Sequence, residues 1–281
     1  MKKAVKMKIA ILIACHKQPE LINQLIDKFD ISTFDFYIHV DTKSNIRSDI
    51  KKQNNVTILT EKESVDVKWG HISQVETTYR LIQKAACKEY EYLWFMSGQD
   101  FPIKSQKEII NFFHERRGIS FIDIQDAYFS ELRNSVHYPN YLISNALLPR
   151  VLRKVYSKIC LSLKLTKKIN NKLYHGSSWF CLHKSIFKKI QDDSSFGQFI
   201  SVFNNALCPD ETVFQTYIKA KNLGQLCENN LTYIDWSERK ANPKTLTIED
   251  FDKLMQSEKL IARKFDLNED KNIIKKLSEL Y

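Results

Sequence analysis

The first half of the chain alternates short apolar runs with segments of helical periodicity. The apolar runs span residues 8–15, 36–40, 56–60, 92–96 and 119–124. The segments with helical spacing span residues 19–29, 72–88 and 105–116. Strands that alternate with helices of this length predict βαβ units, and therefore an α/β fold with a mostly parallel central sheet flanked by helices.

Polar residues close three of these predicted strands. His16 follows the first apolar run, Asp41 follows the second, and Gln99 with Asp100 follows the fourth. Ligands of parallel α/β sheets bind at the carboxyl ends of the strands. We therefore expect these side chains to gather at one edge of the sheet and to mark a site there.

The remaining pattern fits one large domain. It predicts a strand at 178–182, a helix at 184–191, a helix opened by Pro209 and a strand at 231–235. A length of 281 residues with only 6 Gly and 6 Pro leaves little room for long flexible linkers. We expect a single domain over residues 1–281.

Residues 150–172 are rich in Lys and Arg and contain no acidic residue. Their apolar residues recur at helical spacing, which predicts a basic amphipathic helix. These apolar residues are Val151, Leu152, Val155, Ile159 and Leu163. Two interpretations stay open: a helix packed on the domain with a solvated basic face, or a peripheral contact with an anionic membrane surface.

The composition is that of a folded protein with a strongly positive charge. Hydrophobic residues make up 43% of the chain and charged residues 27%, and the formal net charge is +10. Such a charge suits nucleic acid, an anionic membrane or a polyanionic substrate such as a nucleoside diphosphate. No helix-turn-helix, zinc-finger or RNA-recognition pattern is visible, so a nucleic-acid-binding protein is the remote alternative and we expect no nucleic-acid partner.

The cysteines and the N-terminus predict a cytoplasmic protein. The six cysteines are scattered and form no CxxC pair, which is typical of reduced thiols rather than of a disulfide framework or a zinc site. The apolar run at 9–14 is too short for a signal peptide or a membrane-spanning helix. If the basic segment contacts lipid, the protein would lie peripherally on the inner face of the membrane.

Eight strings in order carry a resemblance to a known family. They are IACHKQPELINQLI, FYIHVDTKS, VKWGHIS, YLWFMSGQDFPIKS, GSSWFCL, CPDETVFQT, YIDWS and ARKFD, and they extend from about residue 8 to residue 267. Together they resemble the core-2/I-branching β-1,6-N-acetylglucosaminyltransferases, a family that also includes peptide O-xylosyltransferases. The resemblance implies a GT-A-type fold and an inverting, metal-independent transfer of a sugar from a UDP-sugar to a carbohydrate hydroxyl.

The departures from the animal members of that family bear on the acceptor. Those relatives are Golgi type II membrane proteins, whereas this sequence shows neither an anchor nor paired cysteines. It is similar to a bacterial, cytoplasm-facing version, which favours an acceptor in surface polysaccharide or lipopolysaccharide synthesis, either a carbohydrate or a glycolipid. GlcNAc is the expected donor sugar, and xylose or another UDP-linked sugar is the alternative.

The resemblance places the catalytic base at Glu211, in the string CPDET. An inverting transfer needs one base for the incoming hydroxyl, and a carboxylate within hydrogen-bond reach can serve. UDP is already a good leaving group, so the second carboxyl of a glycosidase is not required. The alternative is that Asp210 and Glu211 only cap the helix that Pro209 opens.

Four residues match nucleotide-site positions of the family, namely His16, Asp41, Trp69 and Asp100. Asp41 could accept a hydrogen bond from uracil or ribose. The alternatives are strand-end capping for Asp41, a core position for Trp69 and a structural turn for Asp100, since Pro102 follows it.

The diphosphate is expected to meet basic side chains rather than a metal ion. No DxD motif closes the strand at 92–96, so we expect no metal site and no cofactor. Lys264, in ARKFD, matches the family lysine for this role, and either Arg239 or Lys244 is expected to assist it. Ordinary surface charge is the alternative for all three.

The acceptor is expected to contact aromatic faces and hydroxyl groups. The candidates are Ser177, Ser178, Trp179, Tyr233 and Trp236. With these assignments the domain divides into a nucleotide-binding half at 1–125, a basic helical insertion at 126–175, and an acceptor- and diphosphate-binding half at 176–281. A glycosidase, with two carboxylates across a sugar cleft, is the enzymatic alternative.

Overall fold

A seven-stranded sheet forms the centre of the protein in the computed structural model, which describes residues 7–127, 131–240 and 242–280. The strand order is β10-β6-β9-β4-β1-β2-β3. Only β9 runs antiparallel to its neighbours. The strands are β1 (Ile9–Cys15), β2 (Phe34–Val40), β3 (Val56–Ile58), β4 (Tyr92–Ser97), β6 (Ser120–Phe121), β9 (Phe180–His183) and β10 (Cys227–Glu228). The predicted α/β class with a mostly parallel sheet is confirmed.

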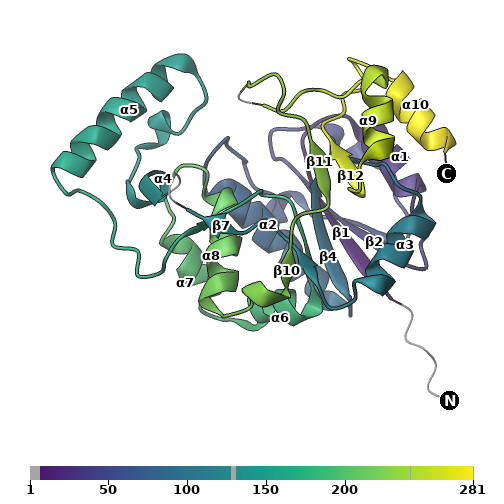
Figure 1. Cartoon of the computed structure of the whole chain (residues 1–281), viewed down its shortest axis with the longest axis horizontal. Helices are drawn as coiled ribbons and strands as arrows, with labels where there is room; N and C mark the ends of the chain where they lie inside the picture. Colours follow the sequence, from purple (N-terminus) through teal and green to yellow (C-terminus); the bar gives the residue numbers. More distant parts are fainter. Residues whose placement is uncertain (1–6, 128–130, 241, 281) are drawn as a thin grey trace.

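Helices cover both faces of this sheet (Figure 1). One face packs against α1 (Pro19–Asp27), α3 (Gln106–Glu115), α9 (Phe251–Gln256) and α10 (Asn272–Glu279). The other face packs against α2 (Ser73–Lys84), α6 (Lys184–Asp192), α7 (Phe196–Ser201) and α8 (Val213–Ala220). The side chains of β1 point alternately to the two faces of the sheet. Ile9, Ile11 and Ile13 pack in the hydrophobic cluster on the first face, and Ala10 and Leu12 pack in the cluster on the other face.

A small second sheet brings the C-terminal segment to the carboxyl edge of the central one. It contains β5 (Phe101–Pro102), β11 (Thr232–Ile234) and β12 (Ile261–Arg263), with β12 in the middle. Gln99 and Phe265 exchange hydrogen bonds, from Phe265 N to Gln99 O at 2.9 Å and from Gln99 Nε2 to Phe265 O at 3.0 Å. Lys17 Nζ also lies 2.7 Å from Asp266 Oδ2. The segment that follows β12 is thus hydrogen-bonded to the loops that follow β1 and β4.

The segment from α4 to β8 extends away from the central sheet. It contains α4 (Glu131–Ser135), α5 (Leu147–Ser162) and β8 (Tyr174–His175), and β8 pairs with β7 (Gln125–Asp126). Figure 1 shows α5 at the outer left, apart from the sheet. Within the described ranges, no helix is both long and apolar enough to cross a bilayer. Short 3₁₀ turns complete the structure: η1 (Ile46–Asp49), η2 (Glu61–Glu63), η3 (Ala85–Cys87), η4 (Asn140–Leu142), η5 (Pro209–Glu211), η6 (Gly224–Leu226) and η7 (Ile248–Asp250).

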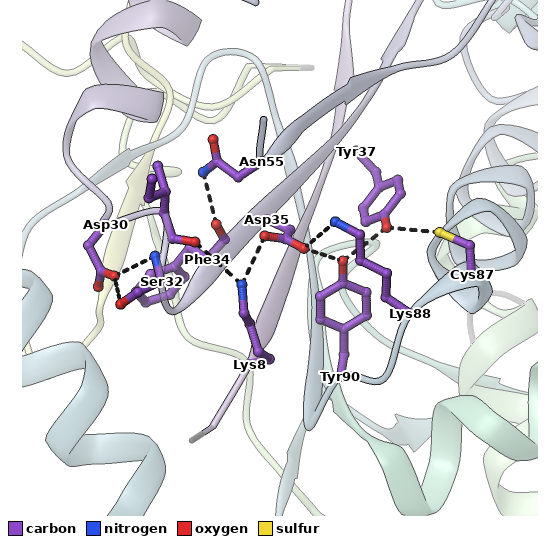
Figure 2. A network of polar contacts seen from close by, with 11 residues as sticks. Lys8, Asp30, Ser32, Phe34, Asp35, Tyr37, Asn55, Cys87, Lys88 and Tyr90 are labelled. Atoms are coloured by element: carbon purple, nitrogen blue, oxygen red, sulfur yellow. Dashed lines mark hydrogen bonds and ion pairs between the residues drawn. The ribbon is translucent and has the colours of Figure 1, made fainter. Parts of the chain in front are cut away.

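A polar network fixes the amino-terminal ends of the central strands, opposite the carboxyl edge (Figure 2). The buried carboxylate of Asp35 in β2 accepts hydrogen bonds from Tyr90 Oη at 2.6 Å, Lys88 Nζ at 2.9 Å and Lys8 Nζ at 3.2 Å. Burial would raise the pKa of Asp35, but these three donors hold it below its usual value. Asp35 is therefore committed to structure, on the strand whose other end reaches Asp41.

Two predicted helices differ from the observed ones. The basic helix covers Leu147–Ser162 rather than 150–172, because Lys164 adopts a left-handed conformation (φ 55°) and Thr166 bridges to Val136. The helix expected to open at Pro209 is instead one 3₁₀ turn, followed by a break at Thr212 (φ −138°) before α8 begins. Glu211 thus ends a turn and is not at the start of a long helix.

Two predicted strands also differ. The run at 119–124 forms only the two-residue strand β6, and the run at 231–235 forms β11 in the small sheet rather than in the central one. In both cases a short apolar run reveals extended backbone but not its pairing partner.

Candidate active site

A cavity of ≈ 1180 Å³ opens at the carboxyl ends of β1, β2 and β4. His16, Asp41 and Gln99, which follow these three strands, all line it. The polar residues that close the strands therefore gather at one edge of the sheet, as the βαβ pattern predicts. This volume is slightly above the roughly 300–1,000 Å³ that is usual for small-molecule sites.

Asp41 and Asp100 are both held by local hydrogen bonds. The Asp41 carboxylate accepts from the backbone N–H groups of Lys43 at 2.9 Å and Val67 at 3.3 Å, and it still faces the cavity. Asp100 is fully buried beneath the cavity floor, where it accepts from Ser97 Oγ at 2.6 Å and Ser97 N at 2.8 Å. Asp41 thus combines a turn role with a place on the lining, whereas Asp100 is not on the lining.

Aromatic side chains surround much of the opening. Trp69 and Trp236 are 41% and 54% exposed and both line the cavity, so neither is a core residue. Tyr233 and Trp179 also line it, and Trp179 stacks on Phe95 with ring centroids 5.2 Å apart. Exposed aromatic faces at a polar cavity suit the C–H surfaces of sugars or a nucleobase.

Glu211 lies on the cavity wall beside a cation. Its Oε2 atom accepts a hydrogen bond from Arg133 Nη2 at 2.7 Å, and it lies 4.0 Å from His175 Nδ1. Burial lowers the pKa of His175, so the imidazole is neutral at neutral pH. Because Arg133 belongs to α4 and His175 to β8, the two ends of the extended segment meet at this carboxylate.

Asp210 and Ser178 form a second polar pair next to Glu211. Ser178 Oγ donates to Asp210 Oδ2 at 2.5 Å, while Asp210 Oδ1 is buried without a hydrogen-bond partner among the described residues. Burial, reinforced by the neighbouring Glu211 charge, raises the pKa of Asp210 to about 6. Ser177, the other predicted hydroxyl, also lines the cavity.

Among the described residues of the C-terminal segment, two cations line the cavity: Lys259, whose Nζ bonds to the carbonyl of Asn230, and Arg263. For Arg263, the surroundings of the guanidinium are known in detail. Its guanidinium carbon lies 4.0 Å from the centroid of the Trp179 ring, and its Nε lies 3.7 Å from Asp100 Oδ1. Nε and Nη1 are buried without a hydrogen-bond partner in the described part of the chain. Burial lowers the pKa of Arg263 although Asp100 opposes the shift, and a guanidinium keeps its charge even so. As a cation on the lining, Arg263 supplies positive charge to the cavity.

The three predicted diphosphate residues do not line the cavity. Lys244 Nζ bonds to the buried Asp250 at 2.6 Å, and Arg239 lies exposed in the loop after Trp236 with φ 50°. Lys264 follows Arg263 on β12, and its carbonyl accepts from Leu246 N at 2.9 Å. Their roles at the phosphates stay predictions.

Sequence reasoning missed Arg133, His175 and Arg263. Arg263 stands beside Lys264 in the string ARKFD, at the point where β12 ends, and the sequence does not say which of the two side chains meets the cavity. Arg133 and His175 lie 42 residues apart in a region with no recognisable motif, and only the fold joins them. Within the described ranges, no three His, Cys, Asp or Glu side chains are grouped as metal ligands.

Comparison with known proteins identifies the family of the chain. The Core-2/I-Branching enzyme family matches residues 9–256. The chain belongs to this family. A curated relative, the mouse β-1,3-galactosyl-O-glycosyl-glycoprotein β-1,6-N-acetylglucosaminyltransferase 4, is 23% identical over 225 residues. That match covers 75% of this core-2/I-branching chain and 47% of the relative, so the chain spans about half the length of the protein it matches.

Comparison of this family member with solved structures gives matches of low similarity. A 4-diphosphocytidyl-2C-methyl-D-erythritol synthase from Anaerococcus prevotii aligns with TM-score 0.43 and 10% identity, covering 89% of this chain and 96% of that one. Mouse xyloside xylosyltransferase 1 in its apo form aligns with TM-score 0.38 and 8% identity, covering 90% and 97%.

Proposed function

We propose that this core-2/I-branching protein is an inverting glycosyltransferase that moves a sugar, GlcNAc in the first instance, from a UDP-sugar to a glycan hydroxyl without a metal ion. The observation that carries the proposal is one cavity lined by both the carboxylate of Glu211 and the guanidinium of Arg263. The first suits proton abstraction and the second suits a departing diphosphate.

The reaction is a single displacement at the anomeric carbon. The acceptor oxygen forms a bond to that carbon while the bond to the β-phosphate oxygen breaks, and UDP leaves with the electron pair. Glu211 takes the proton of the acceptor hydroxyl, so the hydroxyl oxygen becomes the glycosidic oxygen. Because there is one displacement, the anomeric configuration inverts. Arg133, bonded to Glu211 Oε2, orients the carboxylate before the acceptor arrives.

The donor is assigned to the strand-end side of the cavity. Asp41 and His16 line this side, where a uridine would lie at the carboxyl ends of β1 and β2. Arg263 supplies positive charge for the diphosphate, and Lys264 is proposed to add to it from the same segment. The absence of a DxD at the end of β4 is the sequence feature that supports neutralisation by side chains rather than by a cation.

The acceptor is assigned to the aromatic side. Trp179, Tyr233 and Trp236 line the cavity with Ser177 and Ser178, and this set combines stacking surfaces with hydroxyl groups. A glycan or glycolipid of a bacterial surface polysaccharide or lipopolysaccharide is the proposed acceptor class, and the cytoplasm is the proposed compartment.

A donor and acceptor panel tests the proposal. The protein is incubated with UDP-GlcNAc, UDP-xylose, UDP-glucose or UDP-galactose, with and without oligosaccharide acceptors, and UDP release is measured. With UDP-GlcNAc we expect UDP release that depends on the acceptor. NMR of the product is expected to show that the configuration at the anomeric carbon has inverted. A preference for UDP-xylose would reassign the donor within the fold. Sugar release from oligosaccharides in the absence of any nucleotide would replace the transferase by a glycosidase.

A further inference from the structure

The outer face of α5 is apolar and faces solvent. Seven of its large apolar residues are between 45% and 69% exposed, Leu161 among them. The other six form what we call the apolar stripe: Leu147, Leu148, Val151, Leu152, Val155 and Ile159. Their spacing places all six on one side of a helix with 3.6 residues per turn. An exposed contiguous face of large aliphatic side chains marks an interaction surface.

The orientation of α5 is fixed by polar contacts on the opposite side. Arg153 Nη1 donates to the carbonyls of Leu142 at 2.7 Å and Ser144 at 2.8 Å. Ser157 Oγ lies 2.9 Å from Tyr138 Oη. Rotating the helix to bury the apolar stripe would break these buried hydrogen bonds, which are costly to lose. The stripe therefore faces outward as a consequence of how the helix packs.

Cations flank the stripe. Arg150, Lys154 and Lys158 are exposed, and we call them the basic row, since their i, i+4, i+8 spacing aligns them along the edge of the stripe. No Asp or Glu occurs between Glu131 and Asp192, so no acidic side chain of this segment offsets their charge. An apolar face bordered by lysine and arginine fits the interface of an anionic bilayer, where alkyl groups meet acyl chains and cations meet headgroups.

We propose that the apolar stripe and the basic row of α5 dock the protein onto the surface of an anionic lipid bilayer. The helix lies on the bilayer and does not span it, because its 16 residues fall short of the roughly 20 that a crossing needs. This goes beyond the proposed chemistry, since lipid binding requires no donor or acceptor. The sequence left two interpretations of the basic segment open, a helix packed on the domain or a contact with an anionic membrane surface. The proposal follows the second, because the apolar residues of the stripe are exposed and not packed on the domain.

Vesicle flotation tests the proposal. The protein is mixed with vesicles of phosphatidylcholine alone or of phosphatidylcholine and phosphatidylglycerol at 7:3, and the bound fraction is measured. The anionic vesicles are expected to bind on the order of tenfold more protein, and 0.5 M salt is expected to reduce the difference. Equal binding to both compositions, or no binding to either, would overturn the proposal.

Two variants locate the contact. The stripe variant is Leu148→Ser, Leu152→Ser and Val155→Ser; the row variant is Arg150→Glu, Lys154→Glu and Lys158→Glu. Each is expected to lower binding to anionic vesicles by on the order of tenfold or more. The matched controls change exposed residues elsewhere: Ile31→Ser, Ile248→Ser and Leu280→Ser for the stripe, and Lys52→Glu, Lys107→Glu and Lys275→Glu for the row. The controls are expected to bind as wild type does.

Two further measurements separate the rival explanations. Circular dichroism checks that each variant is folded, and since the row variant changes only exposed charges, it keeps the test valid if the stripe variant is unstable. Sedimentation velocity without lipid is expected to give a monomer. A dimer that the stripe variant dissociates would assign the face to a second copy and overturn the proposal. Transfer to a water-soluble acceptor is expected to be unchanged in both variants, so loss of docking and loss of catalysis are independent results.

Discussion

Arg133 Nη2 lies 2.7 Å from Glu211 Oε2, and the two side chains are 28% and 35% exposed. An ion pair this exposed adds little to the stability of the fold. Its importance lies in where it stands, since it holds one oxygen of the proposed base and leaves the other for an acceptor hydroxyl. Arg133 is therefore a positioning residue.

Arg133→Gln removes the cation that orients the Glu211 carboxylate. We expect kcat to fall by about tenfold or more, because a base held in the wrong geometry is less effective, while the KM for the donor stays near its wild-type value. Arg133→Lys should recover part of kcat, because it restores the charge without the fork geometry. Arg116→Gln, which breaks the exposed pair with Glu228, is the matched control and should leave kcat and KM unchanged. A rise in KM with an unchanged kcat would contradict the positioning role.

Glu211→Gln keeps the shape of the side chain but cannot accept a proton. We expect kcat to fall by about 10²–10⁴-fold, with UDP affinity from calorimetry unchanged. Glu115→Gln on α3, another exposed glutamate, should have wild-type kinetics. If the Glu211 variant retained comparable activity, the base would have to be sought elsewhere.

Arg263 and Lys264 are compared by parallel substitution with Met. We expect Arg263→Met to weaken UDP by roughly 10- to 100-fold and to leave uridine affinity nearly unchanged, since a charge-assisted contact to phosphate is lost. Lys264→Met should also weaken UDP more than uridine, but by less, because Lys264 is not on the cavity lining. Equal losses for UDP and uridine would argue against phosphate contact.

The Arg263 variant needs a stability control. Its removal leaves Asp100 buried without a counterion, and this is expected to lower the melting temperature. Adding Asp100→Asn should restore the melting temperature without restoring UDP affinity. Recovery of both together would show that the Arg263 effect was only structural.

The raised pKa of Asp210 predicts that the stability of the fold depends on pH. Burial raises its pKa from 3.8 to about 6, so its contribution to stability is present below pH 4 and is lost as the pH rises through 6. Asp210→Asn stays neutral, and we expect it to be more stable than wild type at pH 8 by roughly 1 to 3 kcal/mol, with the difference reaching its minimum below pH 4. Urea unfolding from pH 3.5 to 8 measures this. Asp252→Asn, at an exposed position, should show no such trend.

Metal dependence is tested with a chelator. With side-chain cations at the diphosphate, we expect EDTA to leave kcat unchanged and Mn²⁺ to give no stimulation after dialysis. A strict requirement for Mn²⁺ would mean that the diphosphate site has been misplaced.

The sheet was predictable because its signal is local. The long strands are rich in apolar residues, with only Asp35 and His39 interrupting β2, and each flanking helix of the first half repeats its apolar residues at helical spacing. The edge occupied by His16 and Asp41 then follows from topology. Where the signal was weak, as in the two-residue strand β6, the pairing was fixed by distant partners that one sequence does not reveal.

The candidate active site was only partly predictable. Of the residues named from the motif resemblance, Glu211 and the aromatic residues line the cavity, and their roles stay predictions. Arg263 is the last residue of β12 and lines the cavity, whereas Lys264, the next residue, does not. Lys244 is paired with a buried Asp250 that no spacing rule indicates. For α5, periodicity predicted an amphipathic helix, yet which face meets the protein depended on the buried contacts of Arg153.

The bonds between Gln99 and Phe265, and between Lys17 and Asp266, bear on how the enzyme matures during translation. Residues 9–99 can pair their strands while the ribosome is still adding the rest, but the segment carrying Arg263 emerges more than 160 residues later. A nascent polypeptide would thus present the β1–β4 side of the cavity before Arg263 reaches it. Under the proposed function, cleavage of the donor would begin only after β12 has docked, so unfinished chains would not consume nucleotide sugar.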